Sequence, residues 1–588
     1  VLEGMKPENL QAVRLGIASH NLFELAFALI QGVENDALDY LQFEMLEGMA
    51  NPQRRALFDM SQNVLLYAPA CSREDFIHAI GYLVRRLDEN TGDDNFLRHA
   101  FKLEVGGEDW NRLQEQFVQS CESVDNVSDT ARRTQDRHEP SKALMQPDHP
   151  WQTFINEPDT DFSLVQNANW ADELVERWEL KTLEKPFDVP LFIAGETVTD
   201  DRRIVEATDP SRPGVVVGRY RQATQEDVDR AVACARDDEA GWRALPIADR
   251  AAILAKAAQE MRDNRGELLG VAMADGGKTI SESDPEVSEA IDFVEFYSRT
   301  ADALRSIPDV EASPCGVVVV VSPWNFPIAI PCGGVAAALA AGNTVILKPA
   351  SDTVLVAQVL CECFWKAGVS KKTLQLIPCS GATVGQHLVS HKDVGVVILT
   401  GGTDTAVQML QQKPELQLLA ETGGKNATIV TSLSDRDQAV KHILHSAFSH
   451  AGQKCSATSL LILDEEVFAD EDFKRALCDA VQSIPVGPAW DLRTKMGPLI
   501  RPASGALEIG LKELEPGESW AVMPHFSDDN PNIVTPGVKW GVEPESFTHM
   551  TEFFGPLLGV MKARNLEEAI RFVNHTGYGL TSGLESLD

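Results

Sequence analysis

Short apolar runs alternate with helical stretches in this 588-residue chain, and that alternation limits the fold more than any other feature. Near the N-terminus the pattern occurs three times, with apolar runs at residues 13–18, 40–45 and 64–68. The helical stretches that follow are residues 21–32, a stretch ending near Met60, and residues 74–90. Strands alternating with helices about every 25 residues are typical of βα units in a parallel sheet or a (β/α) barrel. Because a barrel needs eight units, we expect these to be the last part of one that begins before Val1.

The alternation stops at about residue 120 and returns from Pro186 onward. Residues 121–185 are polar and weakly periodic, which predicts a linker with short helices such as residues 170–180. Beyond it we expect a doubly wound α/β fold, the usual setting for a dinucleotide at strand ends. Its predicted strands are 316–322, 344–347, 373–377, 395–399 and 460–463, and its predicted helices include 328–341, 353–367 and 435–447.

Charge and cysteine usage exclude several classes of protein. The 88 acidic and 52 basic side chains give a net charge of −36, which argues against a nucleic-acid binder in this segment. Ten cysteines at irregular spacing predict neither a disulfide scaffold nor a metal cluster. Residues 1–10 lack the pattern of a secretory signal. The uncharged stretch 312–347 is long enough to span a membrane, but its prolines and glycines favour a buried strand, loop, helix and strand.

One cysteine lies in a sequence suited to chemistry. Cys455 is in the small-residue stretch Gly-Gln-Lys-Cys-Ser-Ala, between a predicted helix and a predicted strand. A nucleophilic thiol needs access and a stabilised thiolate. The alternative is a buried structural cysteine in a glycine-rich turn.

Three further segments carry polar groups at the ends of predicted elements. Asn325 in Ser-Pro-Trp-Asn-Phe-Pro could donate to an oxyanion, Lys348 in Leu-Lys-Pro-Ala suits a ribose or phosphate, and Glu421 in Glu-Thr-Gly-Gly-Lys offers a carboxylate beside a flexible backbone. Taken singly, these residues can equally be a turn residue, a solvated strand end and a helix cap.

Together these segments resemble the aldehyde dehydrogenase family over residues 186–588. The motifs that carry the resemblance, in the family's order, are SPWNFP (322–327), LKPA (347–350), LTGGT (399–403), ETGGK (421–425), GQKCSA (452–457) and EFFGP (552–556). The resemblance implies a cofactor-binding domain at 186–420 and a catalytic domain at 421–588. We expect the catalytic domain to be shortened at its C-terminal end, because relatives continue beyond this point.

The resemblance also implies roles. Cys455 attacks the aldehyde carbon, Asn325 and the Cys455 backbone N–H hold the oxyanion, and Glu421 activates water. Lys348 and Glu552 are expected on the riboses of NAD, with Phe554 against the nicotinamide. The other expected cofactor contacts are Ser322, Trp324, Ser351, Gly381, Gly385, Thr400, Gly401, Gly402, Thr422 and Gly423.

The expected pyrophosphate loop is not a GxGxxG sequence. Gly381-Ala-Thr-Val-Gly385 follows the strand 373–377 and opens a helix, whose N-terminal N–H groups suit an anion. Gly402 lies where many relatives have Ser. Ser351 lies where strictly NAD-selective relatives often have Glu, so NADP stays open beside NAD.

Residues 13–98 resemble the end of the proline dehydrogenase barrel in the proline utilization A family. The carriers are ASHN (18–21), FEMLEGM (43–49), YAP (67–69) and YLVRRLDEN (82–90). By this resemblance Arg85 and Arg86 bind the proline carboxylate, although two adjacent arginines are also typical of a solvated helix face. Tyr67 and Tyr82 would line that site, and Glu89, His20 and Asn21 would contact FAD. Since the earlier strands are missing, we expect FAD in a longer parent protein rather than in this segment alone.

The two resemblances in one chain imply a proline catabolic enzyme of the proline utilization A family, with residues 121–185 as its linker. The aldehyde would then be L-glutamate γ-semialdehyde, the open form of pyrroline-5-carboxylate. Ser456 and a loop containing Ser582 and Gly583 are expected at its carboxylate, and Glu289 at its ammonium. The family further implies a quinone electron acceptor, a homo-oligomer, and a cytoplasmic enzyme that can lie at the inner membrane. Two alternatives are a stand-alone semialdehyde dehydrogenase with a helical appendage and a non-catalytic scaffold.

Overall fold

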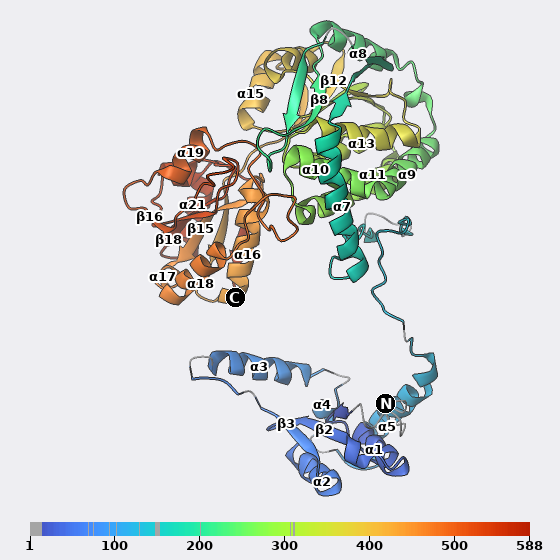
Figure 1. Ribbon diagram of the computed structural model, residues 1–588, viewed down its shortest axis with the longest axis vertical. Coiled ribbons are helices and arrows are strands. Elements are labelled where there is room, and N and C mark those ends of the chain that lie inside the picture. The colour runs from blue at the N-terminus through green and yellow to red at the C-terminus, as the bar shows by residue number, and fades with distance from the viewer. Residues whose placement is uncertain are drawn as a thin grey trace. The chain divides into compact units, whose positions relative to one another are not determined.

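The computed structural model describes residues 14–588 apart from 69, 74–75, 93–94, 101–102, 129, 147–152, 200–201, 306 and 310–311. The chain divides into two compact units, Val1–Arg132 and Arg133–Asp588 (Figure 1). The division falls inside the segment predicted as a linker.

Unit 1 contains the three predicted βα units. Strands β1 (Leu15–Ala18), β2 (Leu41–Leu46) and β3 (Val64–Tyr67) form a parallel sheet in that order. Each strand is followed by a helix, and two further helices end the unit: α1 (Leu22–Glu34), α2 (Asn51–Ser61), α3 (Phe76–Glu89), α4 (Phe96–Ala100) and α5 (Glu108–Glu122). Alternate residues of β2 are buried, so Leu41, Phe43 and Met45 form the centre of a small core. Val13 and residues 74–75, at the starts of a predicted strand and helix, lie outside the described residues.

The first large sheet of unit 2 is entirely parallel, as predicted. Its order is β11-β10-β9-β12-β13, and its strands are β9 (Val317–Val321), β10 (Thr344–Lys348), β11 (Leu374–Leu376), β12 (Val394–Thr400) and β13 (Gln417–Glu421). Helices α12 (Ala329–Ala340) and α13 (Val354–Ala367) confirm two predicted helices. The stretch 312–347 is therefore strand, loop, helix and strand, and no helix among the described residues is long and apolar enough to cross a membrane.

Helices cover both faces of this sheet (Figure 1). The helices against the sheet are α12 and α13 on one face and α8 (Gln225–Asp237), α14 (Gln386–Ser390) and α15 (Thr403–Gln412) on the other, while α9 (Ile247–Asp263), α10 (Arg265–Gly276) and α11 (Ile280–Arg305) pack on α12 and α13. Helix α7 (Val165–Glu184) packs on α10 and is longer than the predicted helix 170–180. The sequence did not predict five short strands that follow it: β4 (Phe187–Val189), β5 (Leu191–Ile193), β6 (Glu196–Val198), β7 (Ile204–Thr208) and β8 (Val216–Arg221).

A second, mixed sheet has the order β16-β17-β18-β15-β14-β19. Its strands are β14 (Asn426–Val430), β15 (Thr458–Asp464), β16 (Ser519–Val522), β17 (Gly537–Trp540), β18 (Leu557–Ala563) and β19 (Ser582–Glu585). Its helices are α16 (Arg436–Phe448), α17 (Glu465–Phe468), α18 (Glu471–Gln482), α19 (Gly505–Lys512), α20 (Phe547–Met550) and α21 (Leu566–His575). The chain passes from β13 of one sheet to β14 of the other through residues 422–425, so the ETGGK motif lies where the two sheets meet.

Candidate active site

Cys455 lies in the loop between the 3₁₀ turn Ser449–Gly452 and β15. The Asn426 side chain donates to the Cys455 carbonyl at 2.6 Å and to the Ala457 carbonyl at 3.0 Å, which anchors the loop to the start of β14. The thiol is half-buried, and burial raises its pKa. The backbone N–H groups of Cys455 and Ser456 oppose that shift, whereas the nearby carboxylates of Glu552 and Glu421 add to it. The thiol therefore has access, oriented donors and two acidic neighbours.

Asn325 is buried beside the nucleophile loop. Its side-chain amide donates to the Gln453 carbonyl at 3.0 Å, two residues before Cys455. The Lys278 ammonium donates to the Asn325 carbonyl at 2.9 Å from the other side. The amide and the thiol are thus held on loops that bond directly to each other. Sequence reasoning missed Lys278 and Asn426, although Asn426 directly follows the ETGGK motif.

Two carboxylates frame the ETGGK segment. Glu421 is exposed at the end of β13, and its carbonyl accepts the Gly401 N–H at 3.1 Å. Glu552 accepts the Gly424 N–H at 2.8 Å, and burial raises its pKa, opposed by that bond and by Lys425. A Cβ at Gly423 would lie 2.1 Å from the Glu552 carboxylate, and one at Gly424 2.6 Å from the Cys455 carbonyl. Both glycines are therefore needed for this close approach.

Aromatic rings adjoin these groups. The ring of Trp324 meets that of Phe554 edge-on at 5.7 Å and that of His450 at 6.2 Å. Phe554 has a left-handed φ of 55°, which is uncommon for a bulky residue and marks a locally constrained loop. Burial lowers the pKa of His450 well below its ordinary value, so this imidazole is neutral.

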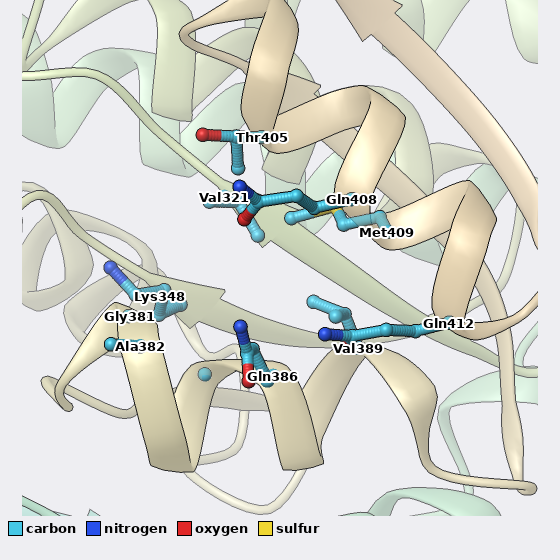
Figure 2. Close-up of a pocket in the computed structure, with 11 residues that line it drawn as sticks. Val321, Lys348, Gly381, Ala382, Gln386, Val389, Thr405, Gln408, Met409 and Gln412 are labelled. Carbon is cyan, nitrogen blue, oxygen red and sulfur yellow. The ribbon is translucent and has the colours of Figure 1, made fainter.

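A cavity of about 440 Å³ lies between α14 and α15, beside the ends of β9 and β10 (Figure 2). Lys348, Gly381 and Gly385 line it, as expected for cofactor-binding residues. Residues 381–385 form a π-type turn that continues into α14. Burial lowers the pKa of Lys348, whose ammonium donates to the Pro349 carbonyl at 3.0 Å. Figure 2 shows three side-chain amides directed into this space that sequence reasoning missed, from Gln386, Gln408 and Gln412.

The other expected cofactor residues are not among those that line this cavity. Ser322 donates its N–H to the Lys348 carbonyl at 3.2 Å. Thr400 ends β12 opposite Glu421, and Gly401 and Gly402 lead into α15. Thr422 follows Glu421 in the segment between the sheets. Ser351 does not line the cavity, and its carbonyl accepts the Tyr220 hydroxyl at 3.1 Å.

The expected substrate residues fall in two places. Ser456, Ser582 and Gly583 line one cavity of about 210 Å³. The expectation of a loop at 582–583 was wrong, because both residues belong to β19, where Ser582 pairs with Ala427 and Gly583 with Thr428 of β14. Glu289 lies on α11, and its pKa is raised by burial and by the charge of Glu286.

In unit 1, most of the predicted proline and flavin residues have protein partners. The Arg86 guanidinium lies 5.3 Å from the centre of the Tyr82 ring and pairs with Glu89, while Arg85 is exposed. Tyr67 donates to Glu44 at 3.0 Å, which raises its pKa. His20 accepts the Leu46 N–H at 3.3 Å, and Asn21 caps α1 through the Phe23 N–H.

Comparison with known proteins places this geometry in a family. Residues 197–588 match the aldehyde dehydrogenase family model. The chain belongs to the aldehyde dehydrogenase family. Residues 2–99 match the proline dehydrogenase model, which argues against a mere helical appendage. The two matches in one chain are the arrangement expected of a proline utilization A-like fusion.

Solved structures and curated relatives of the family agree. Proline utilization A from Corynebacterium freiburgense is 39% identical with a TM-score of 0.78, and the match covers 99% of this chain and 52% of that one. Its counterpart from Bdellovibrio bacteriovorus is 28% identical with a TM-score of 0.87, covering 100% and 60%. A 1-pyrroline-5-carboxylate dehydrogenase from Geobacillus sp. (strain WCH70) is 34% identical, covering 74% of this chain and 87% of the relative. The chain thus spans between half and two thirds of the proline utilization A structures it matches.

Proposed function

We propose that unit 2 oxidises L-glutamate γ-semialdehyde, the open form of pyrroline-5-carboxylate, to glutamate with NAD as hydride acceptor. The observation that carries the proposal is a half-buried Cys455 thiol on a loop bonded to Asn325, with the Glu421 and Glu552 carboxylates near enough to raise its pKa. The relatives that match 74% of this chain are named 1-pyrroline-5-carboxylate dehydrogenases, which supports the choice of substrate.

Cys455 and Asn325 act on the carbonyl group. The Cys455 sulfur forms a bond to the aldehyde carbon, and the carbonyl oxygen gains the electron pair. An amide nitrogen has two N–H donors, and Asn325 uses one on Gln453, so the second is available to the oxyanion together with the Cys455 N–H. NAD, held by Lys348 and Glu552, would supply the acceptor for the hydride that leaves this carbon as the adduct becomes a thioester.

Glu421 acts in the second half of the reaction. Its carboxylate takes a proton from water, whose oxygen bonds to the thioester carbon as the carbon–sulfur bond breaks. The products are a carboxylic acid and the regenerated thiolate of Cys455. The exposure of Glu421 at the end of β13 gives solvent access to this base.

The cavity beside Lys348 fits a dinucleotide. Its glycines at 381 and 385 allow close approach of a phosphate, and its three glutamine amides offer neutral donors and acceptors to a base and sugar. Lys348 and Glu552 would hold the riboses, with Phe554 against the nicotinamide. With Ser351 in place of an acidic side chain, a 2′-phosphate meets no carboxylate at that position, so NADP stays open as an alternative to NAD.

At the other end of the substrate, Ser456, Ser582 and Gly583 would meet the carboxylate and Glu289 the ammonium. The shared cavity of the first three residues supports the carboxylate assignment.

For unit 1 we infer a part in the proline dehydrogenase of a longer protein. Arg85, Arg86, Tyr67 and Tyr82 would bind proline there, while His20, Asn21 and Glu89 would contact FAD, with quinone as the electron acceptor. A homo-oligomer and peripheral attachment to a membrane belong to the same proposal, supported by the similarity to proline utilization A.

The test compares aldehydes in an NADH-formation assay. We expect L-glutamate γ-semialdehyde to exceed propanal in kcat/KM by at least about 100-fold, because a site built for charged groups rejects a substrate that lacks them. Equal values would contradict the substrate assignment. No NADH from either aldehyde would contradict the proposed activity.

A further inference from the structure

Three consecutive residues ahead of the nucleophile have left-handed backbone conformations. The φ angles are 50° at His450, 54° at Ala451 and 66° at Gly452. For residues with a side chain this conformation costs roughly 1–2 kcal/mol each, so surrounding contacts must hold the turn. A Cβ at Gly452 would lie 2.3 Å from the Gly555 carbonyl, so the turn is also pressed against the loop of Phe554.

The carboxylate of Glu282, on α11, contacts residues on both sides of this turn. Glu282, in the first turn of α11, accepts the His450 N–H at 3.2 Å with one oxygen. Its second oxygen lies 3.0 Å from the Lys454 ammonium, and the side chains of Glu282 and Lys454 are only 15% and 19% exposed. Glu282 is therefore bonded to residues on both sides of the turn, and the second of them directly precedes Cys455.

Glu286, one turn further along α11, bonds to the segment that follows Asn325. Glu286 accepts the N–H groups of Ile328 and Ala329 at 2.7 and 3.0 Å. It also pairs at 2.8 Å with Lys278, which donates to the Asn325 carbonyl. Residues four apart lie on one helix face, so a single face of α11 contacts both the thiol loop and the loop of Asn325.

We propose that Glu282 is a positioning residue for the Cys455 thiol. It contacts no reacting atom. It keeps the left-handed turn in place through His450 and fixes the residue before the nucleophile through Lys454, so that the thiol and the Asn325 amide stay at one separation. This role rests on the proposed aldehyde oxidation, and it adds a residue from outside the family motifs.

Steady-state kinetics of the full chain test the role through two variants at one position. Glu282→Ala removes both contacts, and we expect kcat to fall at least about tenfold, since displacing a reacting group by 1 Å can cost about 100-fold. KM for NAD should stay within about twofold, because the cavity at Lys348 is built from other elements. Glu282→Gln keeps an oxygen for the His450 N–H and should recover at least about a third of the wild-type kcat. The matched control is Glu466→Ala, an exposed glutamate on α17, which should match wild type.

A second readout needs no substrate. Alkylation of Cys455 by iodoacetamide, followed by mass spectrometry of its peptide, should change in rate at least about fivefold in Glu282→Ala and little in Glu282→Gln. Wild-type kcat and alkylation rate in Glu282→Ala would overturn the proposal, as would an equal loss in both variants. If wild type forms no NADH from the aldehyde, the proposed function fails while the alkylation rates still decide the role of Glu282.

Discussion

The ammonium group of Lys425 is buried at the end of the ETGGK motif, next to Gly424, whose N–H donates to Glu552. The side chain is 2% exposed, and its nitrogen has no hydrogen-bond partner but lies 4.4 Å from the centre of the Phe553 ring. Burial lowers its pKa from an ordinary 10.5 to about 7, an effect that the charge of Glu552 opposes and that of Lys539 reinforces. The folded chain therefore holds this group as a cation only below about pH 7, and releases its proton above that pH.

The pH dependence of stability should report this lysine. Between pH 7 and 10.5 the unfolded chain holds a proton on Lys425 that the folded chain has released, so the free energy of unfolding rises with pH. The slope contributed is at most about 1.4 kcal/mol per pH unit, and it vanishes below about pH 7, where both states are protonated. The free energy of unfolding in urea, measured from pH 7 to 9.5, should rise with this slope in wild type and lack it in Lys425→Met. Lys562→Met, which removes an exposed lysine, should follow wild type, and parallel profiles for Lys425→Met would refute the assignment.

Among the elements, α7 and α10 make an unusually close contact. Trp178 of α7 is fully buried, and a Cβ at Gly270 of α10 would lie 2.2 Å from its ring. One turn earlier on α10, a Cβ at Gly266 would meet only ordinary contacts at 3.4 Å from Arg177 and Leu174. The contact at Gly270 joins α7, from the segment predicted as a linker, to α10 within unit 2.

The two glycines form a matched pair for mutation. Gly270→Ala should destabilise unit 2 by about 1–3 kcal/mol, because overpacking forces the buried indole to move. Gly266→Ala should be neutral or stabilising by up to about 1 kcal/mol, since alanine favours a helix. The midpoint of thermal unfolding followed by tryptophan fluorescence distinguishes them. A loss at Gly266→Ala as large as at Gly270→Ala would show that the close approach to Trp178 is not what matters.

The parallel strands were predictable because burial on both faces leaves a continuous apolar run. In β9 this run is five consecutive valines, and the structure confirms it within one residue of the expected strand at either end. The strands β6 and β7 were missed because they are short and half exposed, so they lack such a run. Strand β19 was mistaken for a loop because its Ser-Gly start is typical of turns.

In the candidate site, too, residues within local motifs could be predicted, whereas residues brought in from distant segments could not. Cys455, Asn325 and Glu421 lie in contiguous motifs, so the sequence could predict them together. The residues that hold them in place do not lie in such motifs. Glu282 and Lys278 reach the site only because α11 and the end of α10 pack against both loops, and Gln408 enters the cavity only through the placement of α15. Such residues have no local pattern that distinguishes them from solvated helix positions.

At the scale of the whole molecule, the chain is two compact units with separate cores. Unit 1 has a core of a few buried residues around Phe43, whereas unit 2 has several larger cores. If the cofactor cavity belongs to unit 2 alone, NAD can stabilise only that unit.

Differential scanning calorimetry of the full chain should therefore show two transitions with different responses. At NAD concentrations about 100 times Kd, the larger transition should gain about 2.7 kcal/mol, because the ligand binds only the folded form. The smaller transition should not move. A shift of both transitions, or of the smaller alone, would contradict the location of the cofactor site in unit 2.

The role of the Cys455 thiol in aldehyde oxidation by unit 2 can be tested by a single comparison of rates. The rate of NADH formation from L-glutamate γ-semialdehyde is compared in wild type, Cys455→Ala and Cys478→Ala, where Cys478 is a second half-buried cysteine in the same unit. We expect wild type and Cys478→Ala to form NADH at equal rates, and Cys455→Ala, folded by circular dichroism, to form none. NADH formation by Cys455→Ala at the wild-type rate would contradict this role of the thiol.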